Sequence, residues 1–287
     1  MSIYHETKHW LKLRRWQLRR TATSVRWRPD RLANTPVVFG NAMPKSGSHL
    51  IIQILLGLTR LGPFVDPGLP PVNRSEDNLN LPEEQVLANI QRMCAGDIRY
   101  GYIHAREPYL EALTGPDRAT LFVYRDPRDM IVSHVFYATE IHKGHGMHTY
   151  YTQELNSVEE RINAQISGVD KPGFELSPVR KKYDAYLGWL EQPEVLCLRF
   201  EDLILKRDET LEGILVYLES RGFTPEVGRH EAVDALKESI APHKSGTFRK
   251  GKPGNWQEHF TASNKSLFKQ TTGDLLVRLG YEVDDAW

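Results

Sequence analysis

The chain has 287 residues, which is enough for one large α/β domain or two small ones. Hydrophobic residues make up 40% of it and charged residues 26%, so the composition indicates a globular protein with a substantial core. Lysine plus arginine equals aspartate plus glutamate at 37 each, so the global charge gives no reason to expect nucleic acid as a partner. No stretch approaches the about 20 apolar residues of a membrane span, and we expect a cytoplasmic protein.

The first 34 residues form a basic, aromatic extension. Between residues 8 and 31 arginines and lysines alternate with Trp10, Trp16 and Trp27. A helix here would be imperfectly amphipathic, and two interpretations stay open. The helix could lie peripherally on an anionic membrane surface, or it could pack its tryptophans on the protein and leave its arginines in solvent. We expect one domain over residues 35–287 after this extension.

The next segment predicts a buried strand over residues 36–42, a tight turn over residues 44–49 and then an apolar helix. Such a turn directs backbone N–H groups and the positive end of the helix dipole at one point, where phosphate or sulfate oxygens bind well. Lys45 adds a positive charge, Gly47 permits close approach of the backbone, and Ser46 and Ser48 offer hydroxyl donors.

The spacing differs from the triphosphate loop G-x-x-x-x-G-K-[ST], because Lys45 precedes Gly47. The turn instead resembles P-K-S-G-[ST]-x, the 5′-phosphosulfate loop of sulfotransferases, which bind 3′-phosphoadenosine 5′-phosphosulfate (PAPS). The resemblance implies that this loop binds the cofactor and that Lys45 also acts in catalysis. The loop residues so implied are Lys45, Ser46, Gly47, Ser48 and His49.

A short strand over residues 99–103 is predicted to lead to His104. The position resembles the catalytic histidine of the family pattern K-[TS]-H-x-P, although Tyr102 stands in place of the lysine. Transfer to an acceptor needs a base with a pKa near neutrality, which imidazole provides. His104 is therefore our candidate base, and Glu107 is the alternative.

A second motif follows the predicted core strand over residues 120–124. Arg125 comes at the carboxyl end of that strand, where ligands of parallel sheets bind, and Ser133 lies in the following helix. Tyr124 to Ser133 resembles the 3′-phosphate motif [YF]-R-[DN]-P-[RK]-D-x-x-x-S of sulfotransferases. A guanidinium and a nearby hydroxyl suit a phosphate, so Arg125 and Ser133 are predicted to bind it.

Two later segments complete the resemblance. The strand over residues 195–200 ends in an element similar to the family's Y-E-D-L, with Phe200 in place of tyrosine at a cofactor-binding position. Residues 246–261 resemble the carboxy-terminal R-K-G-x-x-G-x-W segment, which implies that Arg249, Lys250 and the Gly251 backbone bind the 3′-phosphate. One last helix is predicted over residues 267–279.

Together these motifs predict a three-layer α/β/α fold with a central, mostly parallel sheet, related to the P-loop nucleotide kinases. The implied activity is sulfuryl transfer from PAPS to a hydroxyl or amine of a small or lipid-like acceptor, with adenosine 3′,5′-bisphosphate as the product. We expect no metal, because the histidines at 142, 145 and 148 lack familiar ligand spacing and the transfer needs none. The alternatives are a non-catalytic adenosine bisphosphate-binding protein and a P-loop kinase. The acceptor and the oligomeric state stay open.

Overall fold

The computed structural model describes residues 3–241 and 251–287. Its contacts divide the chain into two compact units, each built from two separate stretches of sequence. Unit 1 consists of the described residues within 1–124 and 188–244. Unit 2 consists of the described residues within 125–187 and 245–287. The single domain expected over residues 35–287 stays a prediction.

A four-stranded sheet forms the centre of unit 1, and all its neighbouring strands are parallel. The strand order is β2 (Ile98–Gly101), β1 (Val37–Ala42), β3 (Arg118–Tyr124) and β6 (Val195–Arg199). β1 and β3 are buried over almost their whole length, because helices cover both faces. This confirms the predicted parallel sheet, although β2 ends at Gly101 and not at Ile103 as expected.

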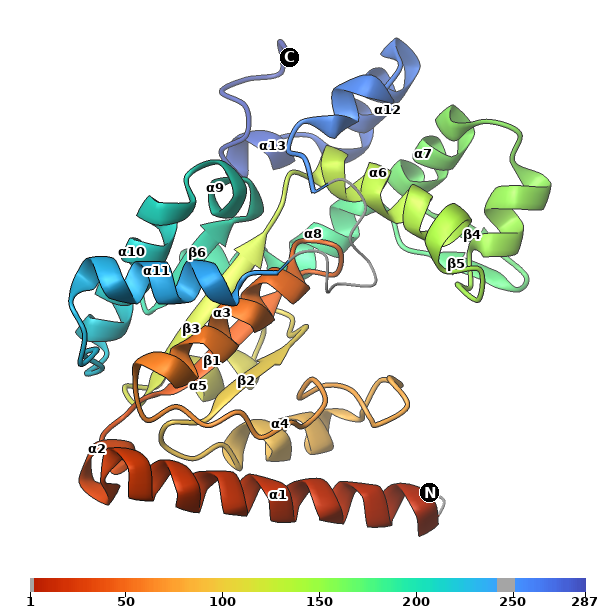
Figure 1. Ribbon diagram of the computed structural model, residues 1–287. Coiled ribbons are helices and arrows are strands. Elements are labelled where there is room, and N and C mark those ends of the chain that lie inside the picture. Colours follow the sequence, from red (N-terminus) through yellow and green to blue (C-terminus); the bar gives the residue numbers. More distant parts are fainter. Residues whose placement is uncertain (1–2, 242–250) are drawn as a thin grey trace. The chain divides into compact units, whose positions relative to one another are not determined.

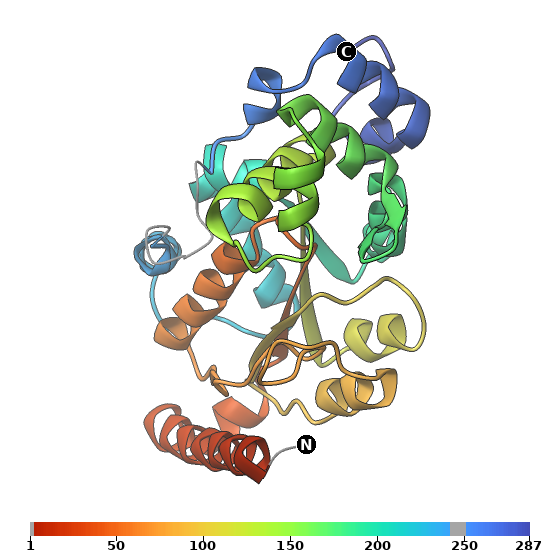
Figure 2. The same cartoon turned by 90° about the vertical axis from the view of Figure 1, so that its right-hand side faces the viewer.

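Helices lie on both faces of this sheet (Figures 1 and 2). One layer contains α3 (Ser48–Leu61), α10 (Arg207–Ser220) and α11 (Arg229–Ser239), and the other contains α4 (Glu83–Gln91) and α5 (Tyr109–Thr114). Alternate strand residues such as Val38 and Leu121 join the apolar core under the first layer. On the other face the Thr120 hydroxyl donates to the Leu113 carbonyl of α5 at 2.6 Å. The predicted three-layer arrangement is confirmed.

The strand order places a switch point at the carboxyl end of β1. After β1 the chain passes through α3 and returns to the sheet as β2, on one side of β1. It later returns as β3, on the other side of β1. Ligands of open α/β sheets bind at such points, outside the carboxyl ends of the strands. The Pro44–His49 turn stands at this position, since it follows β1 directly, and the Met43 N–H donates to the Val123 carbonyl of β3 at 3.2 Å.

The amino-terminal extension folds as the long helix α1 (Ile3–Trp27) and the short helix α2 (Pro29–Ala33). One side of α1 is bonded to the rest of unit 1. Trp16 Nε1 donates to Asp97 at 2.9 Å, Arg20 pairs with the same buried carboxylate at 2.8 Å, and Lys12 pairs with Glu76 at 2.5 Å. This side matches the interpretation in which the helix packs on the protein. No described helix is long and apolar enough to cross a membrane.

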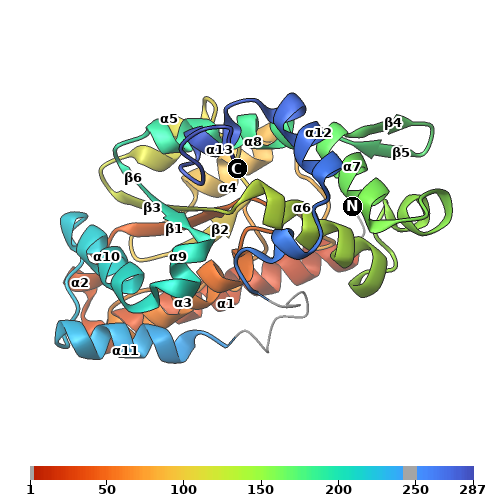
Figure 3. The ribbon, with the colours of Figure 1, turned by 90° about the horizontal axis from the view of Figure 1, so that it is seen from above.

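Unit 2 is mainly helical (Figure 3). Its helices are α6 (Pro127–Phe136), α7 (Val158–Ser167), α8 (Val179–Leu187), α12 (Ala262–Thr272) and α13 (Leu275–Arg278), with π-helical turns at Tyr137–Ile141 and Tyr150–Glu154, a 3₁₀ turn at Asn255–Glu258, and a hairpin of β4 (Val169–Lys171) and β5 (Phe174–Leu176). The 3₁₀ turn Gly188–Glu191 and α9 (Phe200–Leu205) belong to unit 1. The single helix predicted over residues 267–279 is wrong, because Gly273 adopts φ 55° and ends α12 there.

Candidate active site

The turn between β1 and α3 has the backbone geometry of an anion site. Lys45 has φ 67° and Gly47 has φ 100°, so both adopt left-handed conformations, which a lysine rarely does. α3, a helix of 14 residues, begins after Gly47, and no side chain caps it. The first N–H groups of any α-helix have no acceptor within the helix, and here no side chain supplies one. The uncapped N–H groups and the helix dipole favour a bound anion at this point.

The side chains of the turn add polar groups to this site. Ser46 is fully buried, and among the described residues its hydroxyl has no hydrogen-bond partner. A buried polar group without a partner is costly, and a ligand oxygen would satisfy it. Partial burial and then the charge of Lys45 lower the pKa of His49, which indicates a positive potential at the turn. The five loop residues predicted to bind the cofactor therefore lie together at one helix start.

Phe200, the first residue of α9, buttresses the turn from the side. A Cβ atom built on Gly47 would stand 2.6 Å from Cδ2 of the Phe200 ring. The ring thus occupies the space that any other side chain at residue 47 would need, and Phe200 itself is buried. A contact of Phe200 with the cofactor stays a prediction, and its visible role is to shape the loop.

We expect Gly47→Ala to destabilise the protein by about 1–3 kcal/mol, because it adds both a clash and a strained positive φ. Urea unfolding would measure this, and binding of adenosine 3′,5′-bisphosphate should weaken in parallel. Gly213→Ala in α10 is the matched control, since a Cβ there meets no atom within 4 Å. Measured in a Phe200→Ala background, Gly47→Ala should cost only part of what it costs in the wild type, because the ring clash is gone and the strained φ remains. No cost at all in that background would exclude a backbone contribution.

His104 follows β2, and the backbone before it is fixed by two side chains of unit 1. Asn41, fully buried in β1, donates to the Ile103 carbonyl at 2.9 Å and accepts from the Ile103 N–H at 2.8 Å. Trp189 Nε1 donates to the same carbonyl at 2.8 Å. Asn41 lies in β1, four residues before Lys45. β1 therefore leads directly into the anion turn and, through Asn41, also fixes the segment that carries the candidate base.

The surroundings of His104 suit a general base. Its side chain is exposed, while nearby protein and then the charge of Arg106 lower its pKa, so the imidazole is neutral at physiological pH. The alternative base, Glu107, is otherwise engaged. Its Oε2 accepts from the Glu111 N–H at 3.2 Å in the first turn of α5. These contacts favour His104 over Glu107.

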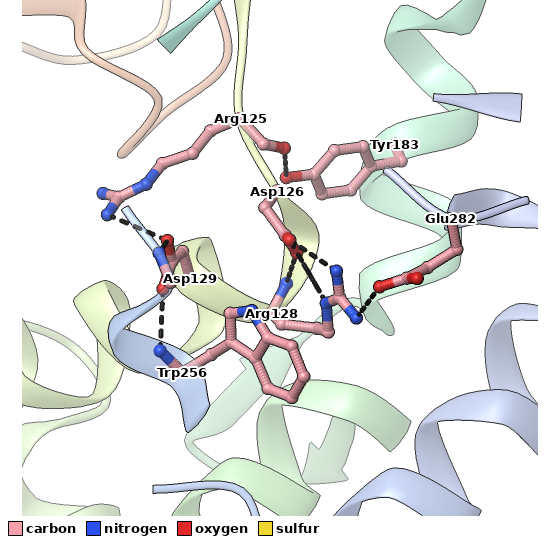
Figure 4. A network of polar contacts seen from close by, with 8 residues as sticks. Arg125, Asp126, Arg128, Asp129, Tyr183, Trp256 and Glu282 are labelled. Atoms are coloured by element: carbon pink, nitrogen blue, oxygen red, sulfur yellow. Dashed lines mark hydrogen bonds and ion pairs between the residues drawn. The ribbon is translucent and has the colours of Figure 1, made fainter. Parts of the chain in front are cut away.

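In unit 2, two of the residues predicted to bind the 3′-phosphate are Arg125, which stands just before α6, and Ser133, which lies within that helix. Arg125 is buried, and its guanidinium lies 3.8 Å from the Asp129 carboxylate. Tyr183 donates to the Arg125 carbonyl at 2.8 Å and so fixes the backbone there (Figure 4). Asp129 and Ser133 are four residues apart, which places them on the same helix face. A guanidinium before the helix start thus lies beside Asp129, and Ser133 follows one helical turn later.

Asp129 also anchors the carboxy-terminal segment, a role that the sequence motif did not indicate. Its two oxygens accept from the Gly254 N–H and the Trp256 N–H, each at 2.8 Å (Figure 4). Burial raises the pKa of the Asp129 carboxyl, and the charge of Arg125 acts in the opposite direction. Gly251, three residues before Gly254, adopts φ 57°. Arg249 and Lys250, the other predicted phosphate ligands, lie outside the described residues.

Arg128 is the second anchor of this segment. It is 3% exposed, and its side chain bonds Asp126 through Nε and Nη2 and pairs with Glu282 at 2.5 Å. Its guanidinium lies 4.0 Å from the centroid of the Trp256 ring and 4.4 Å from that of the Trp287 ring. Such stacking is stabilising when it is desolvated. Within the 3′-phosphate motif, Arg128 therefore has a structural role, and phosphate binding by Arg125 stays a prediction.

We expect Asp129→Ala to lower the free energy of unfolding by about 3 kcal/mol, because it leaves two N–H groups without their acceptor and removes the carboxylate that lies 3.8 Å from the buried Arg125 guanidinium. Guanidinium chloride unfolding followed by tryptophan fluorescence would measure the loss, since Trp256 lies at the anchor. Asp170→Ala on the exposed hairpin is the control and should change stability little. An equal effect of the two substitutions would contradict the anchoring role.

No group of three or more His, Cys, Asp or Glu side chains able to hold a metal occurs among the described residues. His142 is exposed and its ring stacks on Tyr137, whereas the ring of the half-buried His145 meets that of His134 edge to face. The histidine-rich segment thus forms an aromatic cluster in unit 2.

The fold is that of the sulfotransferases. Two solved structures resemble this chain closely enough to show it: a mouse sulfotransferase complexed with PAP (TM-score 0.58, 14% identity, 86% of both chains) and a retinol dehydratase in complex with androsterone and inactive cofactor PAP (TM-score 0.55, 15% identity, 85% of this chain and 83% of that one). At such identities the likeness establishes the three-layer architecture alone.

The family itself follows from the sequence between residues 107 and 280, which matches the sulfotransferase domain family over more than half of the chain. The chain belongs to this family, as the motifs indicated. The matched region contains Arg125, Ser133 and Phe200, and it begins after the anion turn and His104. One relative, the 3-alpha-hydroxysteroid sulfotransferase of Cavia porcellus, is 26% identical over 166 residues, which is 52% of each chain. The match thus spans about half the length of that relative.

Proposed function

We propose that the protein transfers a sulfuryl group from PAPS to a hydroxyl or amine of an acceptor and releases adenosine 3′,5′-bisphosphate. The observation that carries the proposal is the turn after β1, where an uncapped helix start, the left-handed Lys45 and the buried hydroxyl of Ser46 surround one anion site. Family membership supports it, and two solved relatives of the same fold are complexes with PAP.

In the proposed reaction the acceptor oxygen or nitrogen attacks sulfur and forms a new bond to it. The bond between sulfur and the bridging oxygen of the 5′-phosphate breaks, and its electron pair stays on that oxygen. Lys45 and the N–H groups of the turn stabilise this developing charge. The acceptor proton passes to the imidazole of His104, which is neutral because its pKa is lowered. Arg125 and Ser133 hold the 3′-phosphate of the donor.

For the acceptor we propose a small apolar alcohol. The curated relative is named for a hydroxysteroid, and the retinol dehydratase structures are complexes with androsterone and with retinol. Each of these molecules combines an apolar ring or chain with a hydroxyl or carbonyl group. When such a molecule binds in a pocket, burial of its apolar part supplies most of the binding energy. Its hydroxyl group is then free to react with the sulfuryl donor.

The donor experiment separates this activity from the alternatives. The protein is incubated with PAPS, or with ATP and Mg²⁺, and with a panel of steroid, retinoid and phenolic alcohols, and products are measured by mass spectrometry. We expect adenosine 3′,5′-bisphosphate and a sulfated acceptor with PAPS alone. Formation of ADP from ATP, together with no product from PAPS, would indicate a P-loop kinase. Tight bisphosphate binding without transfer to any acceptor would indicate a non-catalytic binding protein.

A further inference from the structure

Helix α1 has a second face, opposite the one that is bonded to unit 1. Leu11, Leu18 and Val25 follow one another at intervals of seven residues, so they form one line along the helix. Their side chains are 47%, 70% and 80% exposed, and Trp10 beside them is 53% exposed. Large apolar side chains in a row on a solvent-facing helix indicate an interaction surface. We call these four residues the outer stripe.

Basic side chains flank the outer stripe. Residues 10–27 contain no acidic residue. Lys12 and Arg20 on the inner face pair with Glu76 and Asp97, whereas Arg14 and Arg15 on the outer face have no acidic partner among the described residues. The guanidinium of Arg14 lies 5.1 Å from the centroid of the Trp10 ring, next to the stripe. The charge of the outer face is therefore available to an anionic partner, although the chain as a whole is neutral.

A groove of about 400 Å³ between α1 and α3 has the same combination of groups. Arg19 and Arg26 of α1 stand at its wall together with Trp27, and Phe64 and the exposed Leu56 of unit 1 supply apolar surface. Asp66 also lines the groove and pairs with Arg19 at 3.1 Å, so the charge of Arg19 is balanced there. Arg26 and the stripe residue Val25 are neighbours on the helix. Through Arg26, cationic and apolar side chains thus continue from the outer stripe towards the side of α1 that faces α3.

The pattern does not fit a second copy of the helix. A two-helix seam needs apolar residues three or four positions after each stripe residue as well. After Leu11 these positions hold Arg14 and Arg15, and after Leu18 they hold Thr21 and the small Ala22, so no large apolar side chain completes the seam. Nucleic acid would use the arginines and leave the stripe without a partner. An anionic bilayer surface uses both, because the stripe enters the interface and the arginines meet lipid phosphates.

We propose that α1 docks the protein on an anionic membrane surface through the outer stripe and the arginines beside it. The helix lies in the plane of the interface, with its inner face still bonded to unit 1. This surface is independent of the proposed transfer reaction, since none of its residues belongs to the turn after β1 or to α6. An apolar acceptor dissolved in that membrane would meet an enzyme held at the same surface.

The test is flotation of the full chain with vesicles of phosphatidylcholine alone or mixed with phosphatidylglycerol, without PAPS. We expect partition onto the anionic vesicles only. Leu11→Asn/Leu18→Asn/Val25→Asn should lower it roughly 100-fold, because three apolar side chains no longer enter the interface. Arg14→Gln/Arg15→Gln should lower it roughly 25-fold, about fivefold for each charge lost, and added salt should weaken wild-type binding.

Leu205→Asn/Val216→Asn is the matched control, since both side chains are exposed but lie on α9 and α10. It should bind vesicles as the wild type does, and all variants should keep the wild-type melting temperature. Equal partition onto neutral and anionic vesicles would overturn the proposal, and so would unchanged binding of the stripe variant. A wild-type dimer that the stripe substitutions dissociate, seen by light scattering, would assign the stripe to a second copy instead.

Discussion

Lys45→Ala is expected to lower kcat/KM for sulfuryl transfer by about 10²–10³-fold, the usual cost of removing one preorganised donor from a developing oxyanion. Lys45 follows the strand that ends at the switch point, and its charge acts on His49 within the same turn. The negative charge on the leaving phosphate grows as the bond to sulfur breaks. The lysine therefore contributes more in the transition state than in the ground state, and kcat should fall more than the affinity for the product nucleotide.

The backbone at Lys45 offers a way to separate charge from strain. Its φ of 67° is unfavourable for any side chain but costs glycine nothing. Lys45→Gly should therefore lose the same activity as Lys45→Ala while the protein melts at a higher temperature than the alanine variant. Lys206→Ala, an exposed lysine after α9, is the control and should keep full activity. Normal turnover by both Lys45 variants would remove the lysine from the proposed reaction.

The elements around the turn were predictable because they are local. An apolar run, a small-residue turn and an amphipathic helix predict β1 and α3 from consecutive residues alone. The break at Gly273 was not predictable in the same way. A single glycine within a helical pattern costs only about 1 kcal/mol, so the pattern alone favours a continuous helix. Here the chain turns at φ 55° after α12, and the Thr272 carbonyl accepts from Arg180, 92 residues away, at 2.6 Å, a contact that the helical pattern does not reveal.

The supports of the site were not predictable, because each joins residues far apart in the sequence. Asn41 appears in the sequence as one polar residue in an apolar strand. Its two bonds to Ile103, 62 residues away, become visible only when β1 and β2 are paired. Asp129 was part of a motif, but its bonds to the N–H groups of Gly254 and Trp256 span 125 and 127 residues. Motifs therefore indicated the residues that are predicted to bind a ligand, and the fold revealed the residues that hold them in place.

His104→Gln is expected to reduce turnover by roughly a hundredfold or more and to leave the affinity for adenosine 3′,5′-bisphosphate unchanged within about twofold. The imidazole accepts the acceptor proton, while nucleotide binding depends on other groups, so the two readouts separate. Glutamine keeps much of the size of histidine and some of its hydrogen bonding, but it is not a base. The backbone at residue 103 is held by Asn41 and Trp189, so the substitution should leave the segment in place.

Glu107→Gln is the matched comparison. Its side-chain oxygen can still accept from the Glu111 N–H, so α5 keeps its first turn, while a carboxylate base is lost. We expect turnover within a few-fold of the wild type. If Glu107→Gln loses the activity and His104→Gln keeps it, the glutamate is the base and the assignment of His104 is wrong.

The pH profile gives a third, independent measurement of the same base. His104 acts only when neutral, so the rate should fall as the pH decreases through its pKa. Partial desolvation by the surrounding protein and then the charge of Arg106 lower that pKa, so the acid limb should lie below the ordinary histidine value of about 6.5. Arg106→Gln removes a cation that disfavours protonation, which raises the pKa and moves the acid limb to higher pH. A limb that stays in place in this variant, or moves to lower pH, would show that another group controls the rate.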